Sequence, residues 1–305
     1  MRVEFKNILC ATDFSDFSNH TINYGVALAK EFEAKLFVSH VIDLSSVAIY
    51  GEFQLDPVGQ QNRIMEDADA QLKELTGDQP ISWEPLITVG KPADEISRAV
   101  EEKNIDLVIT ATRGRSGLKR IILGSVTERL MRTLTCPLLV VNSPEHQLIS
   151  TADRVIKIEK ILVGCDFSPD SGQALKHALS LAQEFEAELH LIHVIETPTQ
   201  PGSYKEDTSA SEEIQQDCRD LLTQKLKDMV PVDARYWCTP QTGLLEGQPY
   251  EEIVTYAESN DIDMIVLGVR GHGVVKTLFL GSTTDRVVSR SPCPVLSVSL
   301  KVQNE

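Results

Sequence analysis

The sequence is short of basic residues. It contains 29 Lys and Arg against 45 Asp and Glu, which gives a formal net charge of −16 at pH 7. Binding to duplex DNA or to an anionic membrane through bulk charge needs a basic surface, so we expect neither a nucleic-acid nor a membrane partner. The deficit does not exclude a small anionic ligand, because backbone N–H groups at a helix N-terminus can hold an anion without net positive charge.

Paired cysteines and long apolar runs are also missing. The six cysteines form no Cys-x-x-Cys pair and no cluster with zinc spacing, so we expect reduced, mostly buried thiols. No apolar run approaches the ~18–20 residues that span a bilayer. The start "MRVEFKNILCATDF" lacks the apolar core of a signal peptide. These features predict a cytoplasmic protein.

The chain contains an internal duplication. The 36 residues from Ile8 share 16 identities with those from Ile161, and the 39 residues from Asn104 share 14 with those from Asp261. The offset between the copies is 153 in the first block and 157 in the second, so the second copy has four extra residues between them. We predict two copies of one domain, 1–145 and 155–301, joined by a polar segment that starts with a Ser-Pro break.

Each copy alternates short apolar runs with stretches of helical periodicity. In the first copy we expect strands at 7–12, 35–42, 83–89, 106–112 and 137–141, and helices at 15–32, 63–75, 92–103 and 125–134. In the second copy we expect a mobile loop over 197–213 and a helix from about Glu212 to Met229. The fold class is therefore α/β, with two repeated five-stranded, mainly parallel sheets that carry helices on both faces.

Three segments of each copy end at the carboxyl edge of the predicted sheet, where ligands bind in open α/β folds. The first segment carries Asp13 in one copy and Asp166 in the other, and these aspartates can accept hydrogen bonds from ribose or a base. The second segment is "HVID" or "HVIE" at the end of the second strand. The third is a glycine-rich loop that ends in Gly-Ser at a helix start, where free N–H groups favour a phosphate. A tight turn followed by a helix cap is an equally simple explanation of the loop. The repeated loops are "RGRSGLKRIILGS" from Arg113 and "RGHGVVKTLFLGS" from Arg270.

The whole pattern resembles the universal stress protein family, whose nucleotide-binding members carry Gly-x2-Gly-x9-Gly-[Ser/Thr] after the fourth strand. The motifs "KILVGCDFS", "IHVIE", "VLGVRGHG" and "LFLGS", in that order, carry the resemblance over nearly the entire chain, as in tandem-domain members. The resemblance implies a fold related to adenine nucleotide α-hydrolases, which is Rossmann-like, with ATP as the usual ligand and pairing of domains.

Carried over by motif, the resemblance assigns a nucleotide-binding set to each copy. The second copy matches at its glycines but has Cys165 where the family often has Thr. The first copy departs at Ala111, where the family has Gly and an added methyl could crowd the phosphate path if that position needs a positive φ. We expect both copies to bind, with slightly more weight on the second because of its glycines. The sets are Thr12, Asp13, Val41, Ala111, Gly114, Gly124 and Ser125, and Asp166, Val194, Gly268, Gly271, Gly281 and Ser282.

Several other residues near these motifs have two interpretations. Val41 and Val194 either offer their backbone to adenine, as the resemblance implies, or are plain strand core. We interpret His40 and His193 as structural rather than catalytic. The basic side chains of the loops either meet phosphates or form solvated surface; they are Arg113, Arg115, Lys119, Arg120, Arg270, His272 and Lys276. Cys136 and Cys293 each precede Pro and are expected to be small buried residues before the last strand.

The leading functional hypothesis is a regulatory ATP-binding protein of the stress response with little or no turnover, because we find no catalytic group with a defensible geometry. Two alternatives stay open. One is a slow hydrolase that uses Mg²⁺ held between phosphates and Asp13 or Asp166. The other is an interaction protein with an apolar or lipid-like ligand between its domains.

The expected partners are a small-molecule nucleotide and the chain's own other copy. The two copies are expected to pack as a pseudo-twofold pair through their last strands, "PLLVVNS" and "PVLSVSL", because an exposed apolar edge strand needs cover. An association of two chains into a homodimer is also open.

Overall fold

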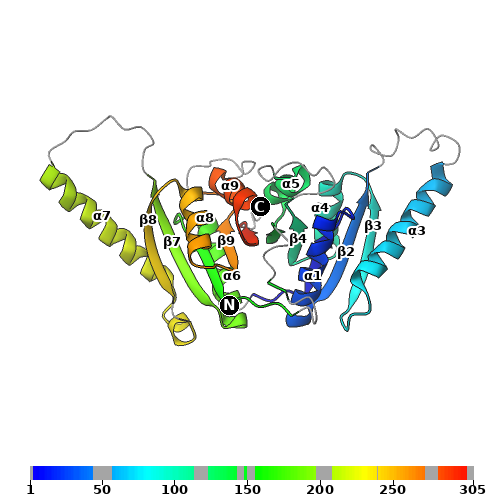
Figure 1. Cartoon of the computed structure of the whole chain (residues 1–305), viewed down its shortest axis with the longest axis horizontal. Coiled ribbons are helices and arrows are strands. Elements are labelled where there is room, and N and C mark those ends of the chain that lie inside the picture. Colours follow the sequence, from blue (N-terminus) through cyan, green and yellow to red (C-terminus); the bar gives the residue numbers. More distant parts are fainter. Residues whose placement is uncertain are drawn as a thin grey trace. The chain divides into compact units, whose positions relative to one another are not determined.

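The structure is a computed structural model that describes residues 3–43, 57–112, 123–142, 148–149, 155–196, 208–238, 240–271 and 281–300. The chain forms two compact units, Glu4–Lys157 and Ile158–Leu300, which correspond to the two copies. Figure 1 shows the helices and strands of both units.

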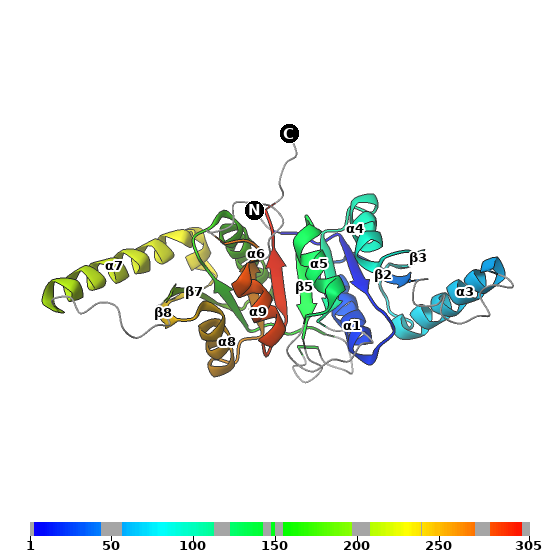
Figure 2. The same ribbon diagram turned by 90° about the horizontal axis from the view of Figure 1, so that it is seen from above.

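The first copy is a five-stranded parallel sheet with strand order β3-β2-β1-β4-β5. Helix α1 packs against α3, and α4 packs against α5. In Figure 2, α4 lies on the opposite side of β2 from α1, so both faces of the sheet are covered. The elements are β1 (Asn7–Ala11), α1 (Asp16–Glu31), β2 (Lys35–Ile42), α3 (Pro57–Thr76), β3 (Trp83–Val89), α4 (Pro92–Glu102), β4 (Leu107–Ala111), α5 (Ser125–Thr133) and β5 (Leu138–Val141).

The second copy repeats this topology with strand order β8-β7-β6-β9-β10, again parallel throughout. Its helices α8 and α9 pack against each other as α4 and α5 do. The elements are β6 (Lys160–Gly164), α6 (Pro169–Phe185), β7 (Glu188–Glu196), α7 (Thr208–Met229), the 3-10 helix η2 (Asp233–Tyr236), β8 (Gln241–Gly247), α8 (Pro249–Ser259), β9 (Met264–Gly268), α9 (Ser282–Arg290) and β10 (Val295–Val298).

The sheets are built as the sequence pattern predicts. Strand β4, which lies between β1 and β5, is buried at every position, as a strand covered on both faces must be. Helix α1 begins after Ser15, whose hydroxyl accepts the Ser18 N–H, and it buries Ile22, Val26 and Ala29 against the sheet. The predicted α/β class with two parallel sheets is confirmed.

Two predicted helix boundaries are wrong. Helix α3 begins at Pro57 rather than near Arg63, and α7 begins at Thr208 rather than near Glu212. Both early turns lie in polar sequence without apolar periodicity, which is the signal that the prediction relied on. The part of the predicted mobile loop at 197–207 lies outside the described residues.

The extra length of the second copy falls between α7 and β8. Helix η2 occupies this interval, whereas residues 77–82 of the first copy contain no helix. Five of the six cysteines are buried and all are free thiols; Cys218 on α7 is exposed. Cys136 and Cys293 are buried just before β5 and β10, as predicted. Within the described residues, no helix is long and apolar enough to cross a bilayer.

Candidate functional site

The turn that follows β1 is held in a strained conformation. Phe14 has a φ of 63°, a left-handed value that is uncommon for a bulky residue. Its ring packs on the imidazole of His40 with centroids 4.1 Å apart, and His40 Nδ1 lies 2.9 Å from the Thr12 carbonyl oxygen. The second copy repeats this turn.

In the second copy, Phe167 has a φ of 62°, and the centroids of its ring and of the His193 imidazole are 4.7 Å apart. His193 Nδ1 lies 2.7 Å from the Cys165 carbonyl oxygen. In both copies the histidine stabilises the turn that presents the aspartate.

The two aspartates differ in how their own turn holds them. Asp13 Oδ1 accepts hydrogen bonds from Ser15 N–H at 3.1 Å, Ser15 Oγ at 2.6 Å and Ser18 Oγ at 2.6 Å. Asp166 Oδ1 accepts the Ser168 N–H at 2.9 Å. The counterpart of Ser18, Ser171, instead donates its hydroxyl to the Ser168 carbonyl.

The residue before each aspartate anchors the following N–H group. Thr12 Oγ1 accepts the Phe14 N–H at 3.0 Å, and Cys165 Sγ accepts the Phe167 N–H at 3.4 Å. The thiol therefore replaces the hydroxyl in this contact. It also lies 3.4 Å from Met229 Sδ at the end of α7, and burial raises its pKa. The departure at Cys165 leaves the turn intact.

The helix after each glycine-rich loop begins against the end of a strand. In the first copy, Gly124 N–H donates to the Thr112 carbonyl at 2.8 Å, and Thr127 Oγ1 donates to the Ala111 carbonyl at 2.8 Å. In the second, the Gly281 N–H donates to Val269 at 3.0 Å and Thr284 Oγ1 to Gly268 at 2.8 Å. These bonds fix the helix start at the carboxyl edge of the sheet.

Glycine is the N-cap residue of both helices, and neither cap has a side-chain hydrogen bond. The first intrahelical bonds run from Glu128 to Gly124 and from Asp285 to Gly281. The N–H groups of the first three helical residues therefore have no acceptor within the helix. Together with the helix dipole they form a site suited to an anion.

The backbone of Val41 faces the end of β1. The Ser39 carbonyl accepts the Thr12 N–H at 2.9 Å, and strand alternation turns the peptide groups of Val41 to the same side. Strand β1 pairs with β2 only as far as Ala11 and Ser39, so Val41 lies beyond the last pair. Val194 has the same relation to β6, whose last pair with β7 joins Gly164 and Ile192.

Gly268 is required by helix packing. A Cβ there would lie 2.7 Å from the carbonyl carbon of Asp170 and 2.7 Å from the Ser171 nitrogen, both in the first turn of α6. Its φ is outside the left-handed region, so the condition under which Ala111 would crowd a phosphate is not met at its counterpart. Gly271 differs, since a Cβ there would lie 2.7 Å from Asp166 Oδ2.

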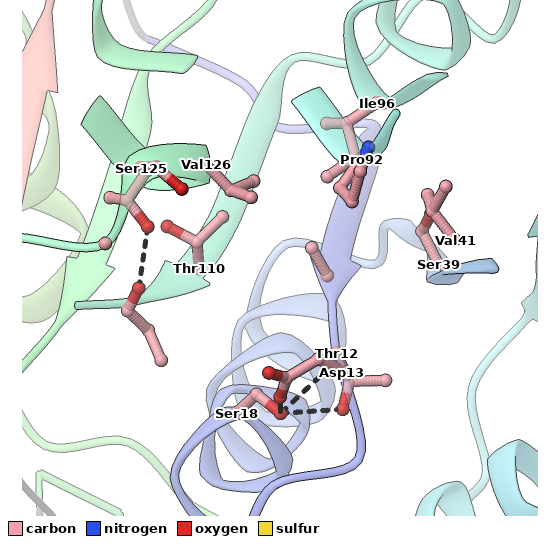
Figure 3. Close-up of a pocket in the computed structure, with 14 residues that line it drawn as sticks. Thr12, Asp13, Ser18, Ser39, Val41, Pro92, Ile96, Thr110, Ser125 and Val126 are labelled. Atoms are coloured by element: carbon pink, nitrogen blue, oxygen red, sulfur yellow. Dashed lines mark hydrogen bonds between the residues drawn. The ribbon is translucent and has the colours of Figure 1, made fainter. Parts of the chain in front are cut away.

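A cavity at the carboxyl edge of each sheet brings the predicted residues together. The first has a volume of about 260 Å³, and Figure 3 shows Ser125 and Val126 across it from Ser39 and Val41. The second has about 600 Å³. The first is lined by Thr12, Asp13, Val41, Ala111, Gly124 and Ser125, and the second by Asp166, Val194, Gly268, Gly271, Gly281 and Ser282. Gly114 lies outside the described residues.

The structure adds lining residues that motif reasoning missed. Pro92 and Ile96 at the start of α4 line the first cavity, and Pro249 and Ile253 of α8 line the second. Both pairs stand at the same offset of 157 and follow a glycine by two and six positions, so the repeat contained a signal for them.

The basic residues of the loops are described only at Arg270. Its guanidinium binds the Asp170 carboxylate rather than solvent, with Nε 3.0 Å from Oδ2. The other six predicted basic positions lie outside the described residues.

Comparison with known proteins places this architecture in a family. A sequence profile described as "Universal stress protein family" matches residues 4–142 and 157–299. The chain belongs to the universal stress protein family. Membership supports a role in the stress response.

Two relatives of this universal stress protein match one copy's length. A universal stress protein of Methanocaldococcus jannaschii is 32% identical over 145 residues, which are 47% of this chain and 85% of that protein. The universal stress protein YxiE of Bacillus subtilis is 32% identical over 150 residues, with 45% of this chain and 99% of that protein covered.

A solved structure aligns with almost the whole chain. The crystal structure of a universal stress protein from Archaeoglobus fulgidus aligns with a TM-score of 0.69 and 24% identity, covering 97% of this chain and 98% of that chain. This likeness shows a shared fold over almost the whole universal stress protein.

Proposed function

We propose that this universal stress protein binds ATP at the carboxyl edge of each sheet and acts as a regulatory nucleotide-binding protein with little or no turnover. One observation carries the proposal. In the second copy, the uncapped start of α9, the close approach of Gly271 to Asp166 and the backbone of Val194 converge on one cavity of about 600 Å³. Cavities of several hundred Å³ are typical of small-molecule sites.

The three groups match the three parts of a nucleoside triphosphate. The N–H groups at Ser282 and the two residues after it would hold phosphate oxygens, because a helix start favours negative charge. The Asp166 carboxylate would accept hydrogen bonds from ribose hydroxyls. The peptide groups of Val194 would face the polar edge of adenine, while Pro249 and Ile253 supply apolar contact with the base.

The residues that line the cavities fit an Mg²⁺ ion that is bound together with the phosphates. Asp166 and Glu196 are the carboxylates among the described residues that line the second cavity, and Asp13 is the one in the first. Mg²⁺ is commonly held by one or two carboxylates together with substrate phosphates. No group of three or more His, Cys, Asp or Glu among the described residues could hold a metal ion by itself. We therefore expect any bound Mg²⁺ to depend on the nucleotide.

The proposal assigns no catalytic residue. A hydrolase must orient a water molecule and stabilise the transferred phosphoryl group. His193 is engaged with the Cys165 carbonyl, and Asp166 is assigned to the nucleoside. We expect ADP release over hours to stay at or below one equivalent per site. Multiple turnovers that require Mg²⁺ would favour the slow hydrolase instead.

The first experiment is to purify the full chain without added nucleotide, denature it and identify the released small molecules by mass spectrometry. Calorimetry with MgATP then gives the number of sites. Two ATP per chain support the proposal in full, whereas one ATP per chain restricts nucleotide binding to a single copy. No ATP by either method overturns it, and a retained apolar ligand would favour the non-nucleotide alternative.

The pairing of the two copies, and any homodimer of chains, stays a prediction. Sedimentation equilibrium of the full chain tests whether two chains form a homodimer. A single species of 33.8 kDa would contradict a homodimer.

A further inference from the structure

A largely buried ion pair in the second copy joins the first turn of α6 to the start of the glycine-rich loop. Asp170 Oδ2 lies 3.0 Å from Arg270 Nε, and the side chains are 7% and 20% exposed. Arg270 immediately precedes Gly271, which approaches the Asp166 carboxylate. The pair therefore lies beside the proposed nucleotide site.

Hydrogen bonds fix the backbone of Arg270 as well as its side chain. Its N–H donates to Asp170 Oδ2 at 3.1 Å, and its carbonyl accepts from Ser168 Oγ at 3.2 Å. Its Nη2 donates to the Leu300 carbonyl at 3.0 Å, while the Leu300 N–H donates to Asp170 Oδ1 at 3.2 Å. Asp170 thus ties together α6, the start of the loop and the chain after β10.

The first copy cannot form this pair. At the offset of 153, Asp170 corresponds to Phe17, which has no carboxylate. Ala111 also stands where Gly268 allows α6 to approach β9, and a Cβ at Gly268 would lie 3.0 Å from Asp170 Cβ. The glycine and the ion pair therefore occur together in one copy, and both are absent from the other.

Stability alone is a weak reason for such a pair, because the cost of desolvating two buried charges often equals their attraction. Its geometric effect is specific. With both peptide groups of Arg270 held, Gly271 is presented against Asp166 before any ligand arrives. Preorganisation of this kind raises the fraction of binding-competent molecules and so tightens the apparent affinity.

We propose that Asp170 is a positioning residue that presets the start of the loop and makes the second copy the tighter of the two nucleotide sites. This inference rests on the proposed ATP binding. Asp170 touches no nucleotide itself in this scheme; it acts through Arg270 and Gly271.

The test is Asp170→Asn in the full chain. The amide retains the shape but has no charge and only one acceptor oxygen, so the ion pair is lost and the side chain cannot accept from both Arg270 and the Leu300 N–H. In two-site calorimetry with MgATP, we expect the tighter step to weaken by about tenfold and the weaker step to stay unchanged. Stopped-flow binding of a fluorescent ATP analogue should place most of the loss in the association rate, since fewer molecules are preset.

Asp263→Asn is the matched control. Asp263 Oδ2 accepts the N–H groups of Glu159 and Lys160 at 2.7 and 2.9 Å near the amino end of β6, so this variant removes the same charge from a carboxylate with a similar pair of hydrogen bonds. It should lower the melting temperature without changing either ATP step. A merely structural role for Asp170 predicts the same behaviour in Asp170→Asn.

The direction of the change in ATP affinity in Asp170→Asn distinguishes a positioning role from a simple effect of the lost negative charge. Removal of a carboxylate near an anion site would by itself tighten ATP binding. Unchanged or tighter binding in Asp170→Asn, with ATP still bound by the wild type, overturns the inference and leaves the proposed function standing. A wild type that binds no nucleotide overturns both. If Asp170→Asn fails to fold, Arg270→Lys replaces it: loss of the Leu300 contact should weaken the tighter step about threefold, and no loss would contradict the inference.

Discussion

His193 Nδ1 lies 2.7 Å from the carbonyl oxygen of Cys165, the residue before the site aspartate. His40 makes the same contact with Thr12 at 2.9 Å in the first copy. A carbonyl can only accept, so Nδ1 carries the proton in both rings. Both rings also cover a phenylalanine held at positive φ. The histidines therefore support the turn.

His193→Ala should lower the free energy of unfolding by about 1–3 kcal/mol, because a largely enclosed carbonyl loses its donor and Phe167 loses its ring contact. His193→Asn, whose amide can reach the Nδ1 position, should recover part of the loss. Urea denaturation of the three proteins measures this. Equal stability of the alanine variant and the wild type would contradict the structural role.

Gly271→Ala should weaken ATP binding in the second copy by about tenfold or more while the fold persists. The added methyl would lie 2.7 Å from Asp166 Oδ2, so the carboxylate must turn away from the position assigned to ribose. Calorimetry with MgATP measures the effect. Gly172→Ala is the control: apart from its chain neighbours and the adjacent helix backbone, no atom lies within 4 Å of its added Cβ. Alanine in helix α6 should stabilise by about 0.5–1 kcal/mol without altering binding. Full ATP affinity in Gly271→Ala would contradict the assigned pose.

Gly268→Ala should destabilise the second copy by about 1–3 kcal/mol, because the methyl would meet the backbone of α6 rather than a flexible side chain. The reverse change, Ala111→Gly, leaves a small gap under α1 and should cost about 1 kcal/mol at β4, through lost packing and greater chain freedom. Chemical denaturation of both variants provides the comparison. A neutral Gly268→Ala would show that α6 can retreat at no cost.

Acid should destabilise the protein through His177. Burial lowers the pKa of this histidine from 6.5 to about 4, and its Nδ1 makes no hydrogen bond among the described residues. Between pH 6.5 and pH 4 the unfolded chain binds a proton at this histidine and the folded chain does not. The free energy of unfolding therefore falls by up to about 3 kcal/mol as the pH drops from about 6.5 towards 4. His177→Tyr introduces the residue found at the matching position, Tyr24.

The His177→Tyr variant should reduce the loss of unfolding free energy at acid pH by up to about 3 kcal/mol. The measurement is the difference in unfolding free energy between wild type and His177→Tyr at pH 7 and pH 4.5. A constant difference would show that His177 does not contribute to acid sensitivity.

Local chemistry made much of the fold predictable. Ser15 caps α1, since a hydroxyl directly before a helical run satisfies a free N–H. The starts of α3 and α7 were missed because their first turns carry no apolar stripe. Long exposed helices of this kind form where later turns pack on the sheet, which a local pattern does not report.

The sequence by itself determined the duplication, the order of strands and helices along the chain, and the convergence of Asp166, Gly271 and Gly281 at one sheet edge. These follow from the identities between the two halves, from apolar periodicity and from strand direction. Only the tertiary structure decided what individual residues do there. Gly268 meets the backbone of α6, and Arg270 binds Asp170, a hundred positions away. Such contacts depend on the distance between packed elements, and that distance is set by the core as a whole rather than by any local motif.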